Sequence, residues 1–110
     1  MEELRTLPEY LKAANADGTV ILQATATWCS QCKAIAPFVD KLVQRFPEAK
    51  FYKYDTDSAG DIAQELGVSQ MPVFTIFRDG DLEETVTGAR GKALEEAIGR
   101  VYGGEVVEVD

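Results

Sequence analysis

Residues 19–35 read TVILQATATWCSQCKAI and pass from a strand pattern to a helix pattern. From Thr19 to Ala26 the apolar side chains fall on both parities, which is typical of a strand covered on both faces within an α/β sheet. From Cys29 to Phe46 the apolar residues recur at intervals of three and four, which predicts a helix with one buried face. Cys29 and Cys32 are therefore expected where a buried strand leads into a helix.

Helices and strands alternate on both sides of this stretch. Strands that alternate with helices form parallel pairs, and a closing hairpin adds antiparallel strands. Residues 4–6 would add a short edge strand. We expect one α/β domain over residues 1–104, with a central mixed β-sheet and helices on both faces, followed by a loose acidic tail over residues 105–110. The remaining expected elements are a helix from Leu7 to Ala14, strands over residues 51–54, 73–77 and 82–87, and helices over residues 58–66 and 92–102.

Some local features follow from individual residues. Ser58 and Asp61 have the spacing of a capping box at the start of the third helix. Tyr52 and Tyr54 are expected at surface positions of their strand. The acids that follow this strand, Asp55 and Asp57, are expected to be solvated caps and not a cation site.

The bulk composition excludes several classes of protein. The chain has 110 residues, of which 45% are hydrophobic and 27% charged, so one domain can bury a core without disulfide staples. The net charge of −8 makes nucleic acid and anionic membranes unsuitable partners. The sequence has no histidine, which rules out Ser-His-Asp and Cys-His catalysis and imidazole metal ligands. Residues 1–6 lack the features of a secretory or transit peptide, so we expect a cytoplasmic location.

The spacing of the two cysteines points to redox chemistry. At positions i and i+3 of a first helical turn, the side chains lie on one side and can form a disulfide. The unpaired N–H groups and the positive dipole end of a helix N-terminus stabilise a thiolate, which is the species that attacks disulfides. We therefore expect Cys29 to be the nucleophile and Cys32 the resolving thiol, with Lys33 adding a weak positive field.

Three other readings of the pair are disfavoured. A structural disulfide that closes so short a loop removes little chain entropy. A zinc site needs four ligands, and the chain has no third cysteine. Unrelated cysteines that happen to share a helix do not explain the strand–Trp-Cys-x-x-Cys–helix context. A C-x-x-C motif beside an α/β pattern indicates a thioredoxin-like redox motif.

The chain resembles the thioredoxin family over nearly its whole length, in the style of fungal members. Several separate segments carry the resemblance, and together they are more specific than any one motif. They are residues 26–29 (ATWC), 32–37 (CKAIAP), 51–57 (FYKYDTD), 71–73 (MPV) and 87–89 (TGA).

The resemblance implies roles for residues outside the cysteine pair. Met71-Pro72 matches the family's cis-proline loop, which faces the cysteines and pairs with the client backbone. Gly88 matches the loop glycine beside the client, where a missing side chain permits close approach. Trp28 is expected to shield the pair and to form part of the docking surface. A thioredoxin reductase, using NADPH, would restore the dithiol, and the chain is expected to bind no cofactor or metal itself.

Two positions depart from the family pattern. Ser30-Gln31 stands between the cysteines where the family usually has Gly-Pro, so we expect a less reducing protein. Gln23 stands where thioredoxins carry a buried aspartate, and an amide cannot accept a proton at neutral pH. General-base assistance to Cys32 should therefore be missing, and resolution of mixed disulfides should be slow. Lys53, which aligns with the lysine near that aspartate, should lack its companion.

The sequence thus predicts a monomeric protein-disulfide reductase acting on disulfide-containing client proteins. Two alternatives stay open. One is a thioredoxin-fold module that binds a partner through Trp28, Met71-Pro72 and Gly88 with little turnover. The other is a dimer that holds an iron–sulfur cluster with two cysteines from each chain.

Overall fold

A computed structural model describes all residues, 1–110, as a mixed five-stranded sheet with helices on both faces. The strand order is β1-β3-β2-β4-β5. The first three strands in this order run parallel, and β4 runs antiparallel to both β2 and β5. The strands are β1 (Glu2–Glu3), β2 (Thr19–Thr25), β3 (Lys50–Asp55), β4 (Val73–Arg78) and β5 (Asp81–Thr87).

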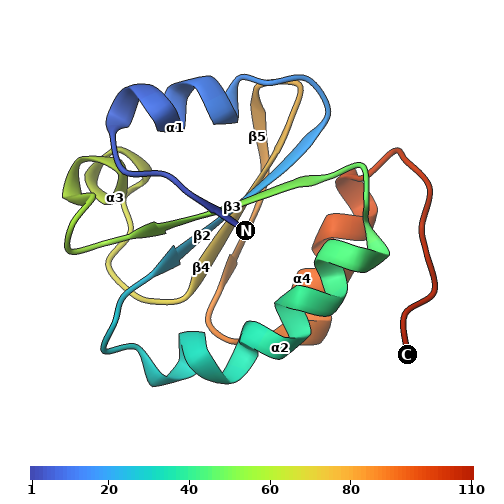
Figure 1. Ribbon diagram of the computed structural model, residues 1–110. Coiled ribbons are helices and arrows are strands. Elements are labelled where there is room, and N and C mark those ends of the chain that lie inside the picture. The colour runs from blue at the N-terminus through green and yellow to red at the C-terminus, as the bar shows by residue number, and fades with distance from the viewer.

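Two helices cover each face of the sheet (Figure 1). Helices α1 (Leu7–Ala14) and α3 (Gly60–Leu66) pack on one face against a core that includes Leu22 and Tyr54. Helices α2 (Ser30–Arg45) and α4 (Gly91–Val101) pack on the other face against a core that includes Ile21 and Phe74. The expected α/β class and mixed sheet are confirmed.

Strand β2 lies in the middle of the sheet and explains the apolar run of the sequence. It pairs with β3 on one side and with β4 on the other. Residues 19–24 are all buried. Leu22 faces the α1/α3 core and Ile21 faces the α2/α4 core, as expected for a strand covered on both faces. Because Gln23 has the parity of Ile21, its side chain lies on the α2/α4 side.

Three local expectations are wrong. The edge strand lies at Glu2–Glu3 instead of residues 4–6, although the Leu4 N–H still donates to the Lys53 carbonyl at 2.8 Å. Helix α3 begins at Gly60, after the N-cap residue Ala59, and has no side-chain cap, so the Ser58–Asp61 capping box does not form.

The third error concerns Tyr54, which is fully buried and not at the surface. Its side chain fills the space between β3 and the helices α1 and α3.

The segment that follows α4 forms no further helix or strand. The Glu105 N–H donates to the Glu48 carboxylate at 2.7 Å, and the Val107 N–H donates to the Arg45 carbonyl at 2.8 Å. The end of α2 is thus a contact site for residues 105–107, and the predicted mobility of residues 105–110 stays a prediction. None of the helices has the length and apolar character that crossing a membrane requires.

Candidate active site

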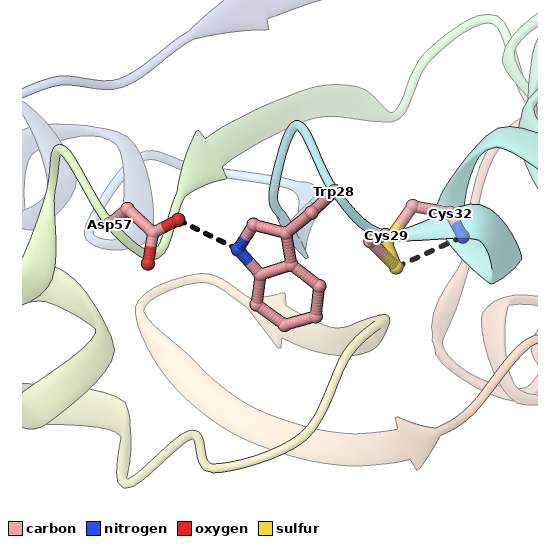
Figure 2. Close-up of a disulfide and its surroundings, with 4 residues drawn as sticks. All are labelled: Trp28, Cys29, Cys32 and Asp57. Carbon is pink, nitrogen blue, oxygen red and sulfur yellow. Dashed lines mark hydrogen bonds between the residues drawn. A yellow bond between two sulfur atoms is a disulfide. The ribbon is translucent and has the colours of Figure 1, made fainter.

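The cysteine pair lies at the N-terminus of α2, directly after the central strand. Cys29 is the N-cap residue of this helix, with an extended backbone (φ −85°, ψ 101°). Cys29 and Cys32 form a disulfide with a Cα–Cα distance of 5.3 Å. The Cys32 N–H donates to Sγ of Cys29 at 3.1 Å (Figure 2). One of the unpaired N–H groups of the helix terminus is therefore satisfied by the Cys29 sulfur.

The electrostatic setting of this sulfur is positive. The first turn of α2 carries no acidic residue that would oppose the helix dipole and the N–H groups acting on the sulfur. The neighbouring side chains Ser30, Gln31 and Lys33 are exposed. Cys29 and Cys32 are each only 5% exposed and pack with Ala26 in a small apolar cluster, so other molecules have limited access to their sulfur atoms. This arrangement can stabilise a thiolate on Cys29 once the disulfide is reduced.

A second segment lies against the pair. Met71 packs on the cluster formed by Ala26, Cys29 and Cys32. The Met71–Pro72 peptide is cis, which confirms the expected geometry of that bond. The carbonyl of Pro72 accepts the Gly88 N–H at 2.8 Å, so the loop that follows β5 is joined to the loop that precedes β4. Gly88 has a left-handed backbone (φ 93°) that favours glycine.

Trp28 is held beside the pair by Asp57, for which the sequence predicts only a solvated cap. The indole is 66% exposed, and its Nε1–H donates to the Asp57 carboxylate at 2.8 Å (Figure 2). The Asp55 side chain accepts the N–H groups of Asp57 and Ser58, which fixes the turn that carries Asp57. Parallel strands β2 and β3 end side by side, so the segments that follow them, which carry Trp28 and Asp57, lie close together. This adjacency is the feature of the sequence from which the Trp28–Asp57 contact could have been predicted.

Behind the pair lies a cavity of about 300 Å³. Gln23 is 7% exposed, and it faces Lys53 across the β2–β3 pair. The Gln23 amide makes no hydrogen bond within the protein, and Lys53 makes no ion pair. Gln23, which stands where thioredoxins carry an aspartate, therefore borders the same cavity as Cys32. The cavity is lined by Met1, Gln23, Thr25, Cys32, Lys33, Ala36, Val39, Asp40 and Lys53.

The structure thus brings together most of the residues that the sequence singled out. Met71 packs against the two cysteines and Trp28 lies beside Cys29 (Figure 2), whereas Gln23 and Lys53 line the cavity behind the disulfide. Nowhere do three or more cysteine, aspartate or glutamate side chains gather as metal ligands. What the arrangement can do chemically is exchange a dithiol for a disulfide.

Comparison with known proteins agrees with this chemistry. The family model described as Thioredoxin matches residues 5–100. The chain is 40% identical to Thioredoxin-1 of Saccharomyces cerevisiae over 96 residues, which cover 87% of this chain and 93% of that protein. It is 45% identical to Thioredoxin Asp f 29 of Aspergillus fumigatus over 89 residues, which cover 79% and 81%.

A solved thioredoxin structure has the same fold as this chain. The oxidised form of mitochondrial thioredoxin 3 from Saccharomyces cerevisiae superposes with a TM-score of 0.88 at 35% identity, covering 91% of this chain and 94% of that one. Fold, cysteine geometry and sequence similarity therefore coincide. The chain belongs to the thioredoxin family of protein-disulfide oxidoreductases.

Proposed function

We propose that the chain reduces the disulfides of client proteins with Cys29 as the attacking and Cys32 as the resolving thiol. The observation that carries the proposal is the N-cap position of Cys29, where the helix terminus and the Cys32 N–H both favour a negative sulfur. The Cys29 thiolate attacks one client sulfur, forms a mixed disulfide and releases the other client sulfur as a thiolate. Cys32 then attacks Sγ of Cys29, which closes the Cys29–Cys32 disulfide and releases the second client thiol.

The surroundings of the pair support a docking strip for an extended client segment. The strip consists of Trp28, Met71-Pro72 and Gly88: Met71 packs against the cysteines, Trp28 directly precedes Cys29 and is exposed, and the Gly88 N–H is bonded to the Pro72 carbonyl. Gly88 lets a client backbone approach closely because it carries no side chain. We assign these residues to client binding.

The dithiol needs an external source of two electrons for each client. A thioredoxin reductase that draws on NADPH is the expected source, since this route serves thioredoxins in general. The cytoplasm and a monomeric state stay predictions; one similar relative, at 36% identity, is named Thioredoxin-3, mitochondrial.

We further propose that Gln23 slows resolution. The Cys32 thiol must lose its proton before it attacks, and the Gln23 amide beside the cavity cannot accept it. The only carboxylate that lines the cavity is Asp40, eight residues farther along α2. At a rise of about 1.5 Å per residue it is about 12 Å from Cys32 along the helix axis, too far for direct transfer.

Replacing Gln23 with aspartate tests this step. General-base assistance is worth about 10²–10⁴-fold where the geometry is suitable, so we expect Gln23→Asp to shorten the lifetime of the mixed disulfide at least tenfold. Rapid-quench trapping of the mixed disulfide measures it, with Gln23→Asn as the control that keeps an amide. An unchanged lifetime in Gln23→Asp would refute the role of Gln23.

The dipeptide Ser30-Gln31 is proposed to make the protein less reducing than its Gly-Pro relatives. Gln31 occupies the first turn of α2, where proline would fix the backbone. Equilibration with a glutathione series measures the reduction potential directly. Gln31→Pro should move the potential to a more negative value, and a shift in the opposite direction would contradict the proposal.

The function as a whole is tested by reduction of insulin with NADPH and a thioredoxin reductase. We expect turnover that Cys29→Ser abolishes, and a stable mixed disulfide with Cys32→Ser. Capture of clients without turnover by the unmodified protein would favour the partner-binding module instead. A coloured, dimeric protein after anaerobic purification would favour the iron–sulfur alternative.

A further inference from the structure

Three cations near the cysteine pair have no ion-pair partner, although the chain as a whole is acidic, and the one carboxylate bonded to the docking strip, that of Asp57, accepts the Trp28 Nε1–H. The chain carries a net charge of −8. Lys33, Arg90 and Lys92 are nevertheless all exposed, and none of them forms an ion pair. Lys33 follows Cys32 in α2, and Arg90 and Lys92 lie at the N-terminus of α4, just after Gly88 of the docking strip. These three cations have no partner within the chain.

Arg90 is the cation most closely joined to the strip. Its stem lies against Gly88, because a Cβ placed on that glycine would be 3.8 Å from Cγ and 3.9 Å from Cδ of Arg90. The Gly88 N–H is bonded to the Pro72 carbonyl at 2.8 Å. Gly88 therefore lies between the Arg90 stem and the cis-proline loop. A client segment lying along Pro72 and Gly88 therefore passes beside Arg90.

The surface next to Arg90 is hollow and largely cationic. A depression of about 570 Å³ is lined by Arg90, Gly91, Lys92, Ala93, Glu96 and Arg100. Arg100 is already committed, since its guanidinium donates to both carboxylate oxygens of Glu84 at 2.8 and 3.0 Å. Arg90 and Lys92 remain available to an incoming carboxylate, and the planar guanidinium suits a carboxylate's two oxygens.

We propose that Arg90, supported by Lys92, selects client disulfides that have an aspartate or glutamate next to the attacked cysteine. The occupant is an acidic, extended client segment. This inference rests on the proposed function and names its preferred substrate class. Because the net charge of the chain is −8, the protein as a whole repels an acidic client, and the unpaired cations at this edge of the strip offset that repulsion locally.

The expected effect is modest and depends on salt. An exposed carboxylate–guanidinium pair changes the rate by about 1.4- to fivefold, since such pairs are worth about 0.2–1 kcal/mol. Screening shortens the reach of the charges to about 10 Å at 0.1 M salt and to about 3 Å at 1 M. The preference should therefore shrink at high ionic strength.

The test uses three disulfide peptides that differ only at the residue before the attacked cysteine, which is glutamate, glutamine or lysine. The ratio of kcat/KM for the glutamate and lysine peptides is measured for each variant at low and high salt. We expect the wild-type protein to prefer the glutamate peptide about fivefold at low salt. Arg90→Gln should bring the ratio near unity, and Arg90→Glu should invert it.

Lys12→Gln is the matched control. Lys12 is an exposed lysine on α1, which leads into the start of β2, whereas the cysteines follow the end of β2. It removes the same charge at the far end of the sheet, so it should keep the wild-type ratio. A wild-type protein without preference, or an Arg90→Gln variant that keeps the preference, would overturn the proposal.

A capture experiment separates this inference from the proposed function. In the Cys32→Ser protein, the rate of mixed-disulfide formation with each peptide reports docking without turnover. Selective capture that depends on Arg90 would support the inference even where insulin is not reduced. Reduction of all three peptides at equal rates would refute the proposed preference for acidic clients but would still support the reductase function.

Discussion

Replacing Tyr54 with phenylalanine is expected to stabilise the protein. The side chain is fully buried between β3 and the helices α1 and α3, and its hydroxyl has no hydrogen-bond partner. Burial, with a smaller contribution from the charge of a deprotonated Tyr10, raises the pKa of the Tyr54 phenol far above its usual value of 10.0. The hydroxyl is thus a buried polar group to which no protein atom is hydrogen-bonded.

The magnitude follows from that unpaired hydroxyl. A buried polar group without a partner costs about 1–3 kcal/mol, because water satisfies it in the unfolded chain. Removing one oxygen forfeits a few atomic contacts of about 0.1–0.2 kcal/mol each. The net gain for Tyr54→Phe is therefore about 1 kcal/mol, which raises Tm by about 4 °C in a domain of this size.

Tyr102→Phe is the same chemical change with the opposite expected sign. The Tyr102 hydroxyl accepts the Glu48 N–H at 3.1 Å and donates to the Glu105 carbonyl at 2.6 Å. Its loss should destabilise the protein by about 1 kcal/mol. Urea unfolding of the oxidised proteins measures both variants, with equal m-values as the check on two-state behaviour. A Tyr54→Phe variant that is less stable than the wild type would refute the reasoning.

Three further changes test other parts of the account. Asp57→Ala removes the acceptor of the Trp28 indole, so Trp28 fluorescence anisotropy should fall and kcat/KM for protein clients should drop a few-fold; unchanged anisotropy would contradict the role of Asp57. The N–H groups of Arg5 and Thr6 donate to the Glu9 carboxylate and lower its pKa from 4.5. The ionised carboxylate therefore contributes fully to stability above about pH 4.5, and this contribution is lost as the pH falls through the lower pKa of the folded state. The difference in Tm between the wild type and Glu9→Gln should vanish in that acidic range. Gly99→Ala, at an exposed position inside α4 with open space around its Cα, should raise the free energy of unfolding by about 1 kcal/mol, and a loss of stability there would show that this space is not open.

The fold was predictable because the strongest patterns in the sequence reflect burial by neighbouring elements. Val20, Leu22 and Ala24 on one parity and Ile21 on the other are apolar because β2 has a helical layer on each face. The helix that begins after Cys29 shows its buried face in Ile35, Val39 and Leu42. Patterns of this kind depend only on local spacing and on which face is covered.

Other features depend on contacts between residues far apart in the chain, which spacing does not encode. Tyr54 stands between the charged residues Lys53 and Asp55 in the sequence, and its burial comes from α1 and α3. The bond from Trp28 to Asp57 joins two loops 29 residues apart. The predicted cap at Ser58 fails because the Asp55 carboxylate takes the N–H groups of this turn and the helix begins later.

The most direct test of the central claim is the alkylation rate of each sulfur in the fully reduced protein, followed by mass spectrometry from about pH 5 to about pH 9. The account requires Cys29 to react first, and to react at neutral pH faster than free cysteine does, because the N-terminus of α2 holds its sulfur as a thiolate. Cys32, one turn farther into the helix and without that cap position, should follow more slowly. A Cys29 sulfur that reacts no faster than a free thiol, or one that reacts after Cys32, would contradict the account.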